Sequence, residues 1–420
     1  MMRGNNTGKT TLLAVDDALA AIIAMLPQTG TNVLHLGDAL GYTLAKDLVA
    51  CLTLPPQAVS AMDGYAVRGE DVSTLPCQLT RVAESAAGHP WPGAIKAGQA
   101  VRIFTGAAIP DGADTIVIQE DVDPVAEQNG VDITVRSAEP VGRYIRPAGL
   151  DVKEGQIILR AGTQLSARAI GLASAAGLTE VVVSLRPRIG VLSTGDELVH
   201  PGTTPGLGQI INSNASFLRG FVTASGAEVV DLGIVRDTPG AMVSSIRNAE
   251  NLDLVVTTGG ASIGVHDHIV SDIDNSEGSE LNFWKIAMRP GKPLISGTVN
   301  GIPLIGLPGN PVSTAVCALV FLRPAIAHMV RDNRIGLGSI DPIFKVPVGV
   351  NLEANDHRQD YIRANLQDSA NGQIVLPASR QDSSMLSVLA TANALIVRPP
   401  HDLAKRAGEV VDVLQIPTLL

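Results

Sequence analysis

The sequence contains few cysteines and few aromatic residues. Its 420 residues include 3 cysteines and only 3% Phe, Trp and Tyr, against 45% hydrophobic residues in total. Cys51, Cys77 and Cys317 lie far apart and form no CxxC pair, which argues against a disulfide framework and a zinc knuckle. The cores must therefore consist mainly of Val, Ile, Leu and Ala, as is typical of parallel sheets and helices, and the cysteine usage predicts a reduced, cytoplasmic location.

Positive charge and long apolar runs are also scarce. The formal net charge is −10, which gives no electrostatic footprint for a nucleic-acid backbone. Asp16 and Asp17 interrupt the only early apolar stretch, so no signal peptide is predicted. We also expect no membrane span, because no apolar run reaches the roughly 18 residues that a span needs.

Several catalytic motifs are missing. The chain has no GxSxG, no HExxH and no GxGxxG after a strand, so nucleophilic catalysis and a dinucleotide fold are weakly supported. The early stretch "GNNTGKT" resembles a P-loop, but it is one residue too short between its glycines and follows no strand. A leader without assigned function is the better interpretation.

The length and the change of pattern along the chain predict three or four domains. Apolar spacing predicts helices over residues 12–24 and 36–48, and "SARAIGLASAAG" at 166–177 predicts another. Between them, short Val/Ile/Thr runs alternate with turns, so we infer a β domain inserted into a helical one. The expected domains are an elongated helical domain at 12–54 and 149–186, the inserted β domain at 55–148, an α/β domain at 187–331, and a β-rich domain at 340–420.

From residue 188 apolar strands alternate with amphipathic helices, which predicts a doubly wound parallel sheet covered on both faces. Ligands of such sheets bind outside the carboxyl ends of the strands. The loops "STGDE", "TTGGAS" and "LPGNPVS" all follow predicted strands. These loops contain glycines that let a ligand approach the backbone, hydroxyl groups, and the first residues of helices, all of which suit an anion. The candidate anion-binding residues are Thr194, Gly195, Gly259, Gly260, Ser262, Gly309 and Asn310.

Acidic residues stand at the same strand ends. Glu197, Asp237 and Asp267 suit a cation, and two bare carboxylates about 4 Å apart repel by about 4 kcal/mol at an effective dielectric of 20. They can therefore converge only around a metal or a protonated partner, and Mg²⁺ bridging a phosphate fits these oxygen ligands best. His266 and His268 are two residues apart and lack further His or Cys nearby, so we expect neither to bind a metal.

A basic cluster follows in "NFWKIAMRPGKP". Lys285, Arg289 and Lys292 lie within eight residues, beside two prolines and a glycine. On charge alone, a solvated basic face is as good an explanation as an anion clamp. The position between two predicted sheet strands favours the clamp.

Polar residues in turns are weaker candidates. "SAMDGYAVR" contains Asp63, "FTGAAIPDGAD" contains Thr105, and "GRYIRPAGLD" contains Asp151. Asp-Gly is a common turn former, and Asp151 has arginines nearby with which to pair. Alone, each of these residues is better explained by structure than by function.

Eight motifs together resemble the MoeA family, the molybdopterin molybdenumtransferases, also found as the C-terminal part of gephyrin. They are "PPQAVSAMDGYAVR", "RIFTGAAIPDGADTIVIQED", "GLDVKEG", "LSTGDEL", "INSN", "TTGGASIGVHD", "FWKIAMRPGKP" and "GLPGNPVSTAV". The resemblance spans nearly the whole chain. It implies the domain plan above with a C-terminal β-barrel, and a homodimer in which Asp63, Thr105 and Asp151 of one subunit face the sheet loops of the other.

The resemblance implies insertion of molybdate into adenylylated molybdopterin with Mg²⁺-dependent release of AMP, and makes the molybdopterin adenylyltransferase a candidate partner. Asp63 and Asp151 are then essential acids and Thr105 their hydrogen-bond partner. The other implied roles are Mg²⁺ and phosphate positioning by Glu197, Asp237 and Asp267, molybdate or phosphate binding by Lys285, Arg289 and Lys292, and pterin binding by Pro308, Pro311 and Ser383.

Two residues depart from the family pattern, which has lysine in place of Arg289 and glycine in place of Asp382. Arginine retains the charge but cannot donate its proton, and Asp382 adds a charge beside Ser383. Two alternatives stay open from the sequence. One is a non-catalytic binding or scaffold protein of the same fold, and the other is an enzyme that inserts tungstate, which nearly matches molybdate in size and charge.

Overall fold

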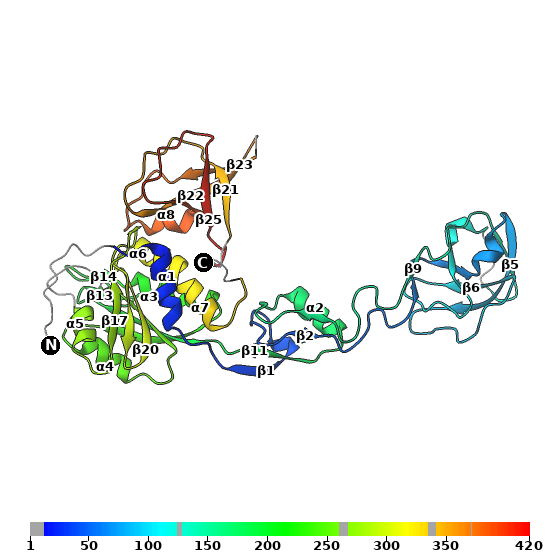
Figure 1. The fold of residues 1–420 in the computed structure, drawn as a ribbon, viewed down its shortest axis with the longest axis horizontal. Helices are drawn as coiled ribbons and strands as arrows, with labels where there is room; N and C mark the ends of the chain where they lie inside the picture. The colour runs from blue at the N-terminus through cyan, green and yellow to red at the C-terminus, as the bar shows by residue number, and fades with distance from the viewer. Residues whose placement is uncertain (1–11, 124–127, 260–267, 335–341, 371) are drawn as a thin grey trace.

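The computed structural model describes residues 12–123, 128–259, 268–334, 342–370 and 372–420. The molecule is elongated, with the α/β domain and the C-terminal sheet at one end and a small β domain at the far end (Figure 1). A narrow middle region between them contains a short helix and short strands (Figure 1).

The α/β domain contains a six-stranded sheet. Its strands, in spatial order, are β15 (Glu228–Val235), β12 (Arg188–Thr194), β16 (Leu254–Thr258), β20 (Ile302–Leu307), β19 (Ile295–Val299) and β17 (Glu280–Trp284). The first four are parallel, as predicted. After β12 the chain forms β15 on one side of it, and β16 then pairs with β12 on the other side. The strand order therefore reverses between β12 and β16. Ligands of open α/β sheets bind at such a reversal.

The prediction of a fully parallel sheet is wrong at one edge, where β19 and β17 run antiparallel. A two-residue turn joins β19 to β20, with Asn300 at φ 51° and Gly301 at φ 76°. Positive φ at both positions is the geometry of a tight hairpin turn, and Asn-Gly favours it strongly. The hairpin reverses the chain and makes an antiparallel edge unavoidable.

Helices cover both faces of this sheet. α4 (Ala241–Arg247) and α5 (His268–Asp274) pack on one face with Leu192 and Val255. The other face holds α3 (Ser213–Ala224) and one long helical run made of α6 (Pro311–Cys317), the π-helical segment η4 (Ala318–Leu322) and α7 (Arg323–Met329).

The first helix, α1 (Val15–Met25), also packs on this second face. Its buried residues Val15, Leu19 and Ile22 share one core with Leu218, Phe221 and the α6–α7 run. Part of the segment that the sequence assigns to the helical domain at 12–54 thus packs on the α/β domain. An amphipathic pattern indicates a buried face but does not say which core it joins.

The middle region is less helical than predicted. α2 (Ala167–Ala175) forms as expected, and its N-cap Ser166 accepts a hydrogen bond from the backbone N–H of Ala169. The second predicted helix, at 36–48, is absent, because Gly41 at φ 77° interrupts the run. In its place lie the 3-10 turn η1 (Leu36–Asp38) and the short strand pairs β1 (Thr31–His35) with β11 (Glu180–Ser184) and β2 (Leu48–Val49) with β10 (Ile157–Leu159).

The small β domain contains a five-stranded sheet and a short strand pair. The sheet strands, in spatial order, are β7 (Thr115–Ile118), β4 (Gly64–Val67), β6 (Gln99–Ile103), β5 (Cys77–Ser85) and β8 (Asp132–Val135). The pair is β3 (Val59–Ser60) with β9 (Ile145–Arg146), and the 3-10 turns are η2 (Gly69–Val72) and η3 (Gln119–Asp121). Its cores surround Val117 and Ile116 on the two faces of β7.

The C-terminal domain is built on β21 (Ile343–Pro347), β22 (Gln359–Ser369), β23 (Gly372–Pro377), β24 (Ala394–Arg398) and β25 (Val410–Gln415), with the helix α8 (Leu386–Thr391). A bridge between Val348 and Val375 joins the end of β21 to β23, which brings the two edges of the sheet together. One further strand, β18 (Met288–Arg289), comes from the α/β domain and pairs with β22.

Within the described residues, one helical run is long and apolar enough to cross a membrane. It is Pro311–Met329, of 19 residues, and 89% of its most apolar window is buried inside the chain. The expectation that no run reaches this length is therefore wrong. The burial is that of a core helix, because α1, α3 and the sheet pack against it.

Candidate active site

A cavity of about 570 Å³ lies at the carboxyl ends of β12 and β16, where the strand order reverses. We call it the switch-point cavity. Its lining includes predicted residues from four loops, namely Thr194, Gly195, Glu197, Asp237, Gly259, Pro308, Gly309, Asn310 and Pro311. Gly260, Ser262 and Asp267 fall outside the described residues. The structure thus brings together most of the residues that the sequence placed at the strand ends.

Glycine is required where the cavity floor crosses the sheet. Gly259 has a φ of 93°, and a Cβ there would lie 2.3 Å from the carbonyl oxygen of Thr194. Gly195 has a φ of 147°, and its Cβ would lie 2.6 Å from a carboxylate oxygen of Glu197. Side chains at these positions would strain the backbone and displace the neighbouring loop. The two glycines keep the floor open to the close approach of a ligand.

Two asparagines hold the loops around the cavity. Asn214 Nδ2 donates to Thr258 Oγ1 and to the carbonyl oxygen of Gly309, each at 2.8 Å. Asn212 caps α3, since its Oδ1 accepts from the backbone N–H of Ala215 at 3.2 Å. Because Asn212, Ser213 and Asn214 all line the cavity, the N-terminus of α3 faces it. A helix N-terminus presents free N–H groups and a positive partial charge, which suits a phosphate.

One buried hydroxyl in the cavity lacks a partner. Thr194 is 6% exposed, and its Oγ1 accepts and donates no hydrogen bond within the described residues. An unpaired buried hydroxyl costs about 1–3 kcal/mol, so such a group calls for a partner from outside the chain.

The predicted cation ligands are partly assembled. Glu197 and Asp237 both line the switch-point cavity, from the loops after β12 and β15. No group of three or more His, Cys, Asp or Glu side chains with metal-ligating geometry occurs in the described part of the chain. Two carboxylates beside a phosphate-binding helix end still fit Mg²⁺, which takes one or two protein carboxylates and completes its shell with water and phosphate oxygens.

A second cavity of about 560 Å³ adjoins the first, since Pro293 and Ser313 line both. We call it the arginine pocket. Its charged and polar lining residues are Arg289, Lys292, Arg358, Asp360, Arg363, Gln381 and Ser383. Lys292 and Arg289 are predicted residues, whereas Arg358 and Arg363 come from the C-terminal domain and carry no motif that the sequence analysis used.

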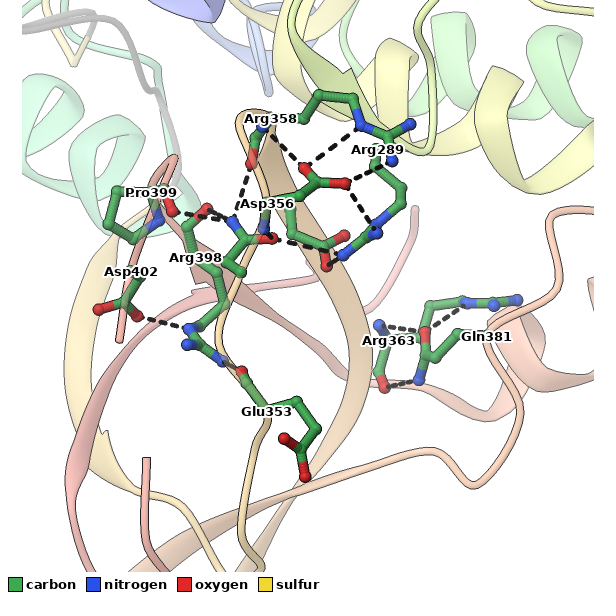
Figure 2. Close-up of polar contacts among 11 residues, drawn as sticks. Arg289, Glu353, Asp356, Arg358, Arg363, Gln381, Arg398, Pro399 and Asp402 are labelled. Carbon is green, nitrogen blue, oxygen red and sulfur yellow. Dashed lines mark hydrogen bonds and ion pairs between the residues drawn. The ribbon is translucent and has the colours of Figure 1, made fainter. Parts of the chain in front are cut away.

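Arg363 is the most deeply buried cation of the arginine pocket, at 1% exposure. Its Nε donates to Gln381 Oε1 at 3.2 Å (Figure 2). One terminal nitrogen donates to the carbonyl oxygen of Asp382 at 3.0 Å. These acceptors are neutral, and no ion pair to Arg363 occurs within the described residues. Burial lowers the pKa of this guanidinium. The charge of Asp382 acts on Arg363 in the opposite direction, but no carboxylate forms a direct ion pair with this buried group in the described part of the chain.

Arg289 differs from the expected anion clamp. Its guanidinium pairs with Asp356 (Figure 2). It also pairs with Asp360 and donates to Asn355 Oδ1 at 3.3 Å. These partners, chiefly Asp360, raise the pKa of Arg289. Lys285, the third expected member, lies outside the linings of both cavities, and its carbonyl oxygen meets the N–H of Leu13 at 3.5 Å. Arg289 instead forms ion pairs with carboxylates of the C-terminal domain. The sequence alone could not place these carboxylates beside it.

Ser383 and Asp382 shape the wall between the cavities. Asn310 Nδ2 donates to Ser383 Oγ at 3.0 Å, and the N–H of Val312 donates to the Ser383 carbonyl oxygen at 3.0 Å. Asp382 accepts from the N–H and the hydroxyl of Ser384, which lowers its pKa. The added charge at Asp382 therefore closes a local turn, and this turn carries Ser383 to the loop before α6.

Asp63, Thr105 and Asp151 lie away from both cavities. Asp63 Oδ1 accepts from the backbone N–H of Thr105 at 2.7 Å and from its hydroxyl at 2.8 Å, and these bonds lower the pKa of Asp63. Both residues belong to the small β domain, at the opposite end of the molecule from the α/β domain (Figure 1). Asp151 is exposed in the segment that leaves this domain. One chain alone does not bring these residues to the cavities.

The residues that the sequence analysis missed are Asn212, Asn214, Arg358 and Arg363. "INSN" contains both asparagines, and asparagine before a helix is a capping signal, so this pair was detectable. Arg363 stands in an ordinary strand pattern and Arg358 directly precedes that strand, so only the packing of two domains shows that they face the α/β loops.

Comparison with known proteins covers the chain almost completely. Residues 13–177 match the MoeA N-terminal region (domain I and II), residues 190–328 a probable molybdopterin binding domain, and residues 345–416 the MoeA C-terminal region (domain IV). The chain is 33% identical over 405 residues to the molybdopterin molybdenumtransferase of Haemophilus influenzae, covering 96% of this chain and 98% of that protein. It is 35% identical over 427 residues to that of a Nostoc species, covering 97% and 95%.

The fold agrees with these sequence matches. The crystal structure of a molybdopterin biosynthesis moeA protein from Pyrococcus horikoshii superposes with a TM-score of 0.83 at 26% identity, covering 97% of this chain and all of that one. From its sequence and its fold, the chain belongs to the MoeA family.

Proposed function

We propose that the chain is a transferase that inserts molybdenum into molybdopterin, with the pterin nucleotide in the switch-point cavity and molybdate in the arginine pocket. The observation that carries this proposal is Arg363, a buried cation of the arginine pocket that forms no ion pair within the described residues. A buried unpaired charge is strongly unfavourable, so an incoming anion stabilises the site. Molybdate, a tetrahedral dianion, supplies that charge.

The two cavities divide the work. In the switch-point cavity, the N-terminus of α3 and the unpaired hydroxyl of Thr194 offer donors to a phosphate, and Gly259 lets it approach the backbone. In the arginine pocket, Arg363 and Lys292 hold the oxyanion beside Ser383, which contacts the loop before α6. Holding two reactants in adjoining cavities replaces their random encounter with a fixed orientation.

Glu197 and Asp237 are the proposed Mg²⁺ ligands of the described part of the chain, and Asp267 is a further candidate. When bound, the ion neutralises phosphate charge and polarises the bond that is cleaved. We further propose that the substrate is adenylylated molybdopterin and that AMP is the second product. Such a substrate requires an adenylyltransferase to supply it, which is the proposed partner.

The active form is proposed to be a homodimer. Asp63, Thr105 and Asp151 lie far from the cavities of their own chain, yet Asp63 is held as an ionised carboxylate by two hydrogen bonds from Thr105. In a two-fold dimer the small β domain of one subunit can reach the cavities of the other, because the two ends of this elongated chain are widely separated (Figure 1). The acids would then complete the partner's site.

The test is AMP release from adenylylated molybdopterin, with Mg²⁺ present and molybdate titrated against tungstate. We expect release that requires both Mg²⁺ and molybdate, and the titration ranks the two oxyanions. Arg363→Gln should raise the KM for molybdate at least about tenfold, whereas Arg398→Gln, which removes a buried arginine outside both cavities, should lower only stability. A folded protein that binds the pterin nucleotide but releases no AMP would contradict the transferase.

The dimer is tested by mixing two impaired variants at molybdate concentrations far below the KM of Arg363→Gln, where that variant has little activity. Asp151→Ala removes an acid that a subunit contributes to its partner's site, whereas Arg363→Gln changes the arginine pocket of the subunit's own site. In a mixed dimer both substitutions fall in the same site, so the other site is intact. Because half of a statistical mixture is mixed dimer, about a quarter of wild-type activity should return. If no activity returns although subunit exchange is verified, all residues of one site belong to one chain and the shared site is refuted.

A further inference from the structure

The arginine pocket is built jointly by two domains. One wall is the loop at 288–293, which follows β17 in the α/β domain, and the other wall is β22 of the C-terminal domain. β18 in this loop pairs in parallel with β22, with Met288 opposite Gln359 and Arg289 opposite Asp360. The shape of the pocket therefore depends on how the C-terminal domain is docked.

Four charged residues join the two walls, and we call them the ion-pair chain: Asp360, Arg289, Asp356 and Arg358. Asp360, 8% exposed, pairs with Arg289, which also reaches Asp356 Oδ2 at 3.3 Å. The same Asp356 oxygen accepts from Arg358 at 2.6 Å, and Asp356 Oδ1 accepts from the Arg358 backbone N–H at 2.8 Å. Figure 2 shows Asp356 between the two guanidinium groups.

The charged residues of the arginine pocket fall into two groups, those paired with each other and those that form no ion pair within the described residues. The ion-pair chain has two carboxylates and two guanidiniums, so it is neutral as a unit. Arg363 and Lys292 remain, and both line the pocket. Two positive charges match a tetrahedral dianion, whereas the donors of Arg289 are directed at three oxygen atoms of its own chain.

We infer that Asp360 and Arg289 are positioning residues, whose ion pair docks the C-terminal domain so that Arg363 and Lys292 meet across the pocket and bind the oxyanion. This inference rests on the proposed function, since molybdate is its ligand. Arg289 then differs from Lys292 in role, although both lie in one loop. The affinity for molybdate depends on Asp360, a carboxylate that itself repels the anion.

Because of this dependence, the two possible roles of Asp360 predict opposite changes in the affinity for molybdate. If Asp360 acted only through its charge, replacing it with asparagine would remove a repulsion and tighten molybdate binding. If Asp360 positions the wall, the same replacement releases Arg289 and weakens binding. Asparagine keeps nearly the same shape, so the sign of the change separates the two roles.

The experiment compares the dissociation constant of molybdate, measured by calorimetry on the full-length protein, with KM and kcat for molybdate. Asp360→Asn should weaken binding and raise KM by about tenfold, with kcat at saturating molybdate within about twofold of wild type. Asp402→Asn is the matched control, because it removes the partner of the buried Arg398 in the same domain but outside the pocket, and should leave molybdate binding unchanged.

Unchanged or tighter molybdate binding by Asp360→Asn would overturn the inference. Asp356→Asn is the second variant in case Asp360→Asn does not fold, and it should also weaken binding because it frees Arg358 and one contact of Arg289. Equal affinity in Asp356→Asn and wild type would likewise overturn it. A wild-type protein that binds no molybdate at all would refute the proposed function instead, so the two failures are distinguishable.

Discussion

Asn214 donates a hydrogen bond of 2.8 Å to the hydroxyl of Thr258, at the carboxyl end of the strand on which the switch-point cavity rests. The same amide nitrogen reaches the carbonyl oxygen of Gly309, so one side chain at the start of α3 ties together the loops after β16 and β20. The segment that begins α3 thereby holds the loops of the cavity in place.

Asn214→Ala removes both bonds, and the free energy of unfolding should fall by about 1–2 kcal/mol. Because the loops that line the cavity then separate, the affinity for the pterin nucleotide should fall about tenfold. Asn393→Ala is a matched control, since Asn393 also bonds to backbone groups, the N–H of Leu366 at 2.7 Å and its carbonyl oxygen at 3.3 Å, but in the C-terminal domain. Calorimetric titration should show weaker binding in the first variant alone; equal losses in both would contradict the framing role.

Much of the α/β domain followed from the sequence, because the loop residues there obey local rules. Gly259 follows a buried strand and needs φ of 93°, which glycine alone adopts without strain, and the carboxyl ends of parallel strands meet at one edge. The antiparallel edge was equally readable. Asn300-Gly301 between two apolar runs is a strong signal of a hairpin, and a hairpin makes its two strands antiparallel.

Other features depend on contacts between distant segments. The apolar spacing of Leu36, Leu44 and Leu48 imitates a helix, but these residues are buried because an irregular segment wraps around α2. Arg363 looks like any polar residue of a strand until its domain docks on the loop at 288–293. Local pattern carries no information on which domain a residue faces, and this is why half of the arginine pocket escaped prediction.

Thr194→Val should have opposite effects on stability and on binding. Valine matches threonine in shape and removes a buried hydroxyl without a partner, so the free energy of unfolding should rise by about 1 kcal/mol. If the pterin nucleotide supplies the missing partner, its affinity should fall about fivefold to tenfold at the same time.

Thr257→Val is the control for that substitution. Thr257 Oγ1 is also buried without a partner, on the same strand as Thr258, but Thr257 does not line the switch-point cavity. Thermal unfolding should show a similar gain in both variants, and nucleotide binding should weaken only in Thr194→Val. Unchanged binding in both would mean that the ligand does not use Thr194.

Gly259→Ala should close the cavity floor. The new methyl group would lie 2.3 Å from the Thr194 carbonyl oxygen, which is fixed in β12 and cannot move without breaking the sheet. We expect nucleotide binding to fall by more than about tenfold. Gly301→Ala shares the positive φ, at 76°, but its methyl group meets no atom within 4 Å, so it should cost about 1 kcal/mol of stability and leave binding intact. Equal binding by the two variants would show that the floor is not the ligand surface.

Asp356 should make the docking of the C-terminal domain sensitive to acid. Its pKa lies well below the ordinary value of 3.8, mainly because the Arg358 side chain and backbone N–H donate to it. A carboxylate with a lowered pKa in the folded protein stabilises the fold above its ordinary pKa, and that stabilisation disappears as the pH falls through the folded value. Asp356→Asn should therefore have a lower Tm than wild type near neutral pH, and the difference should shrink steadily below about pH 4. Asp368→Asn, at an exposed carboxylate near the end of β22, is the control. A Tm difference for Asp356→Asn that stays constant from neutral to acid pH would mean that the ionised form of Asp356 does not stabilise the folded domain.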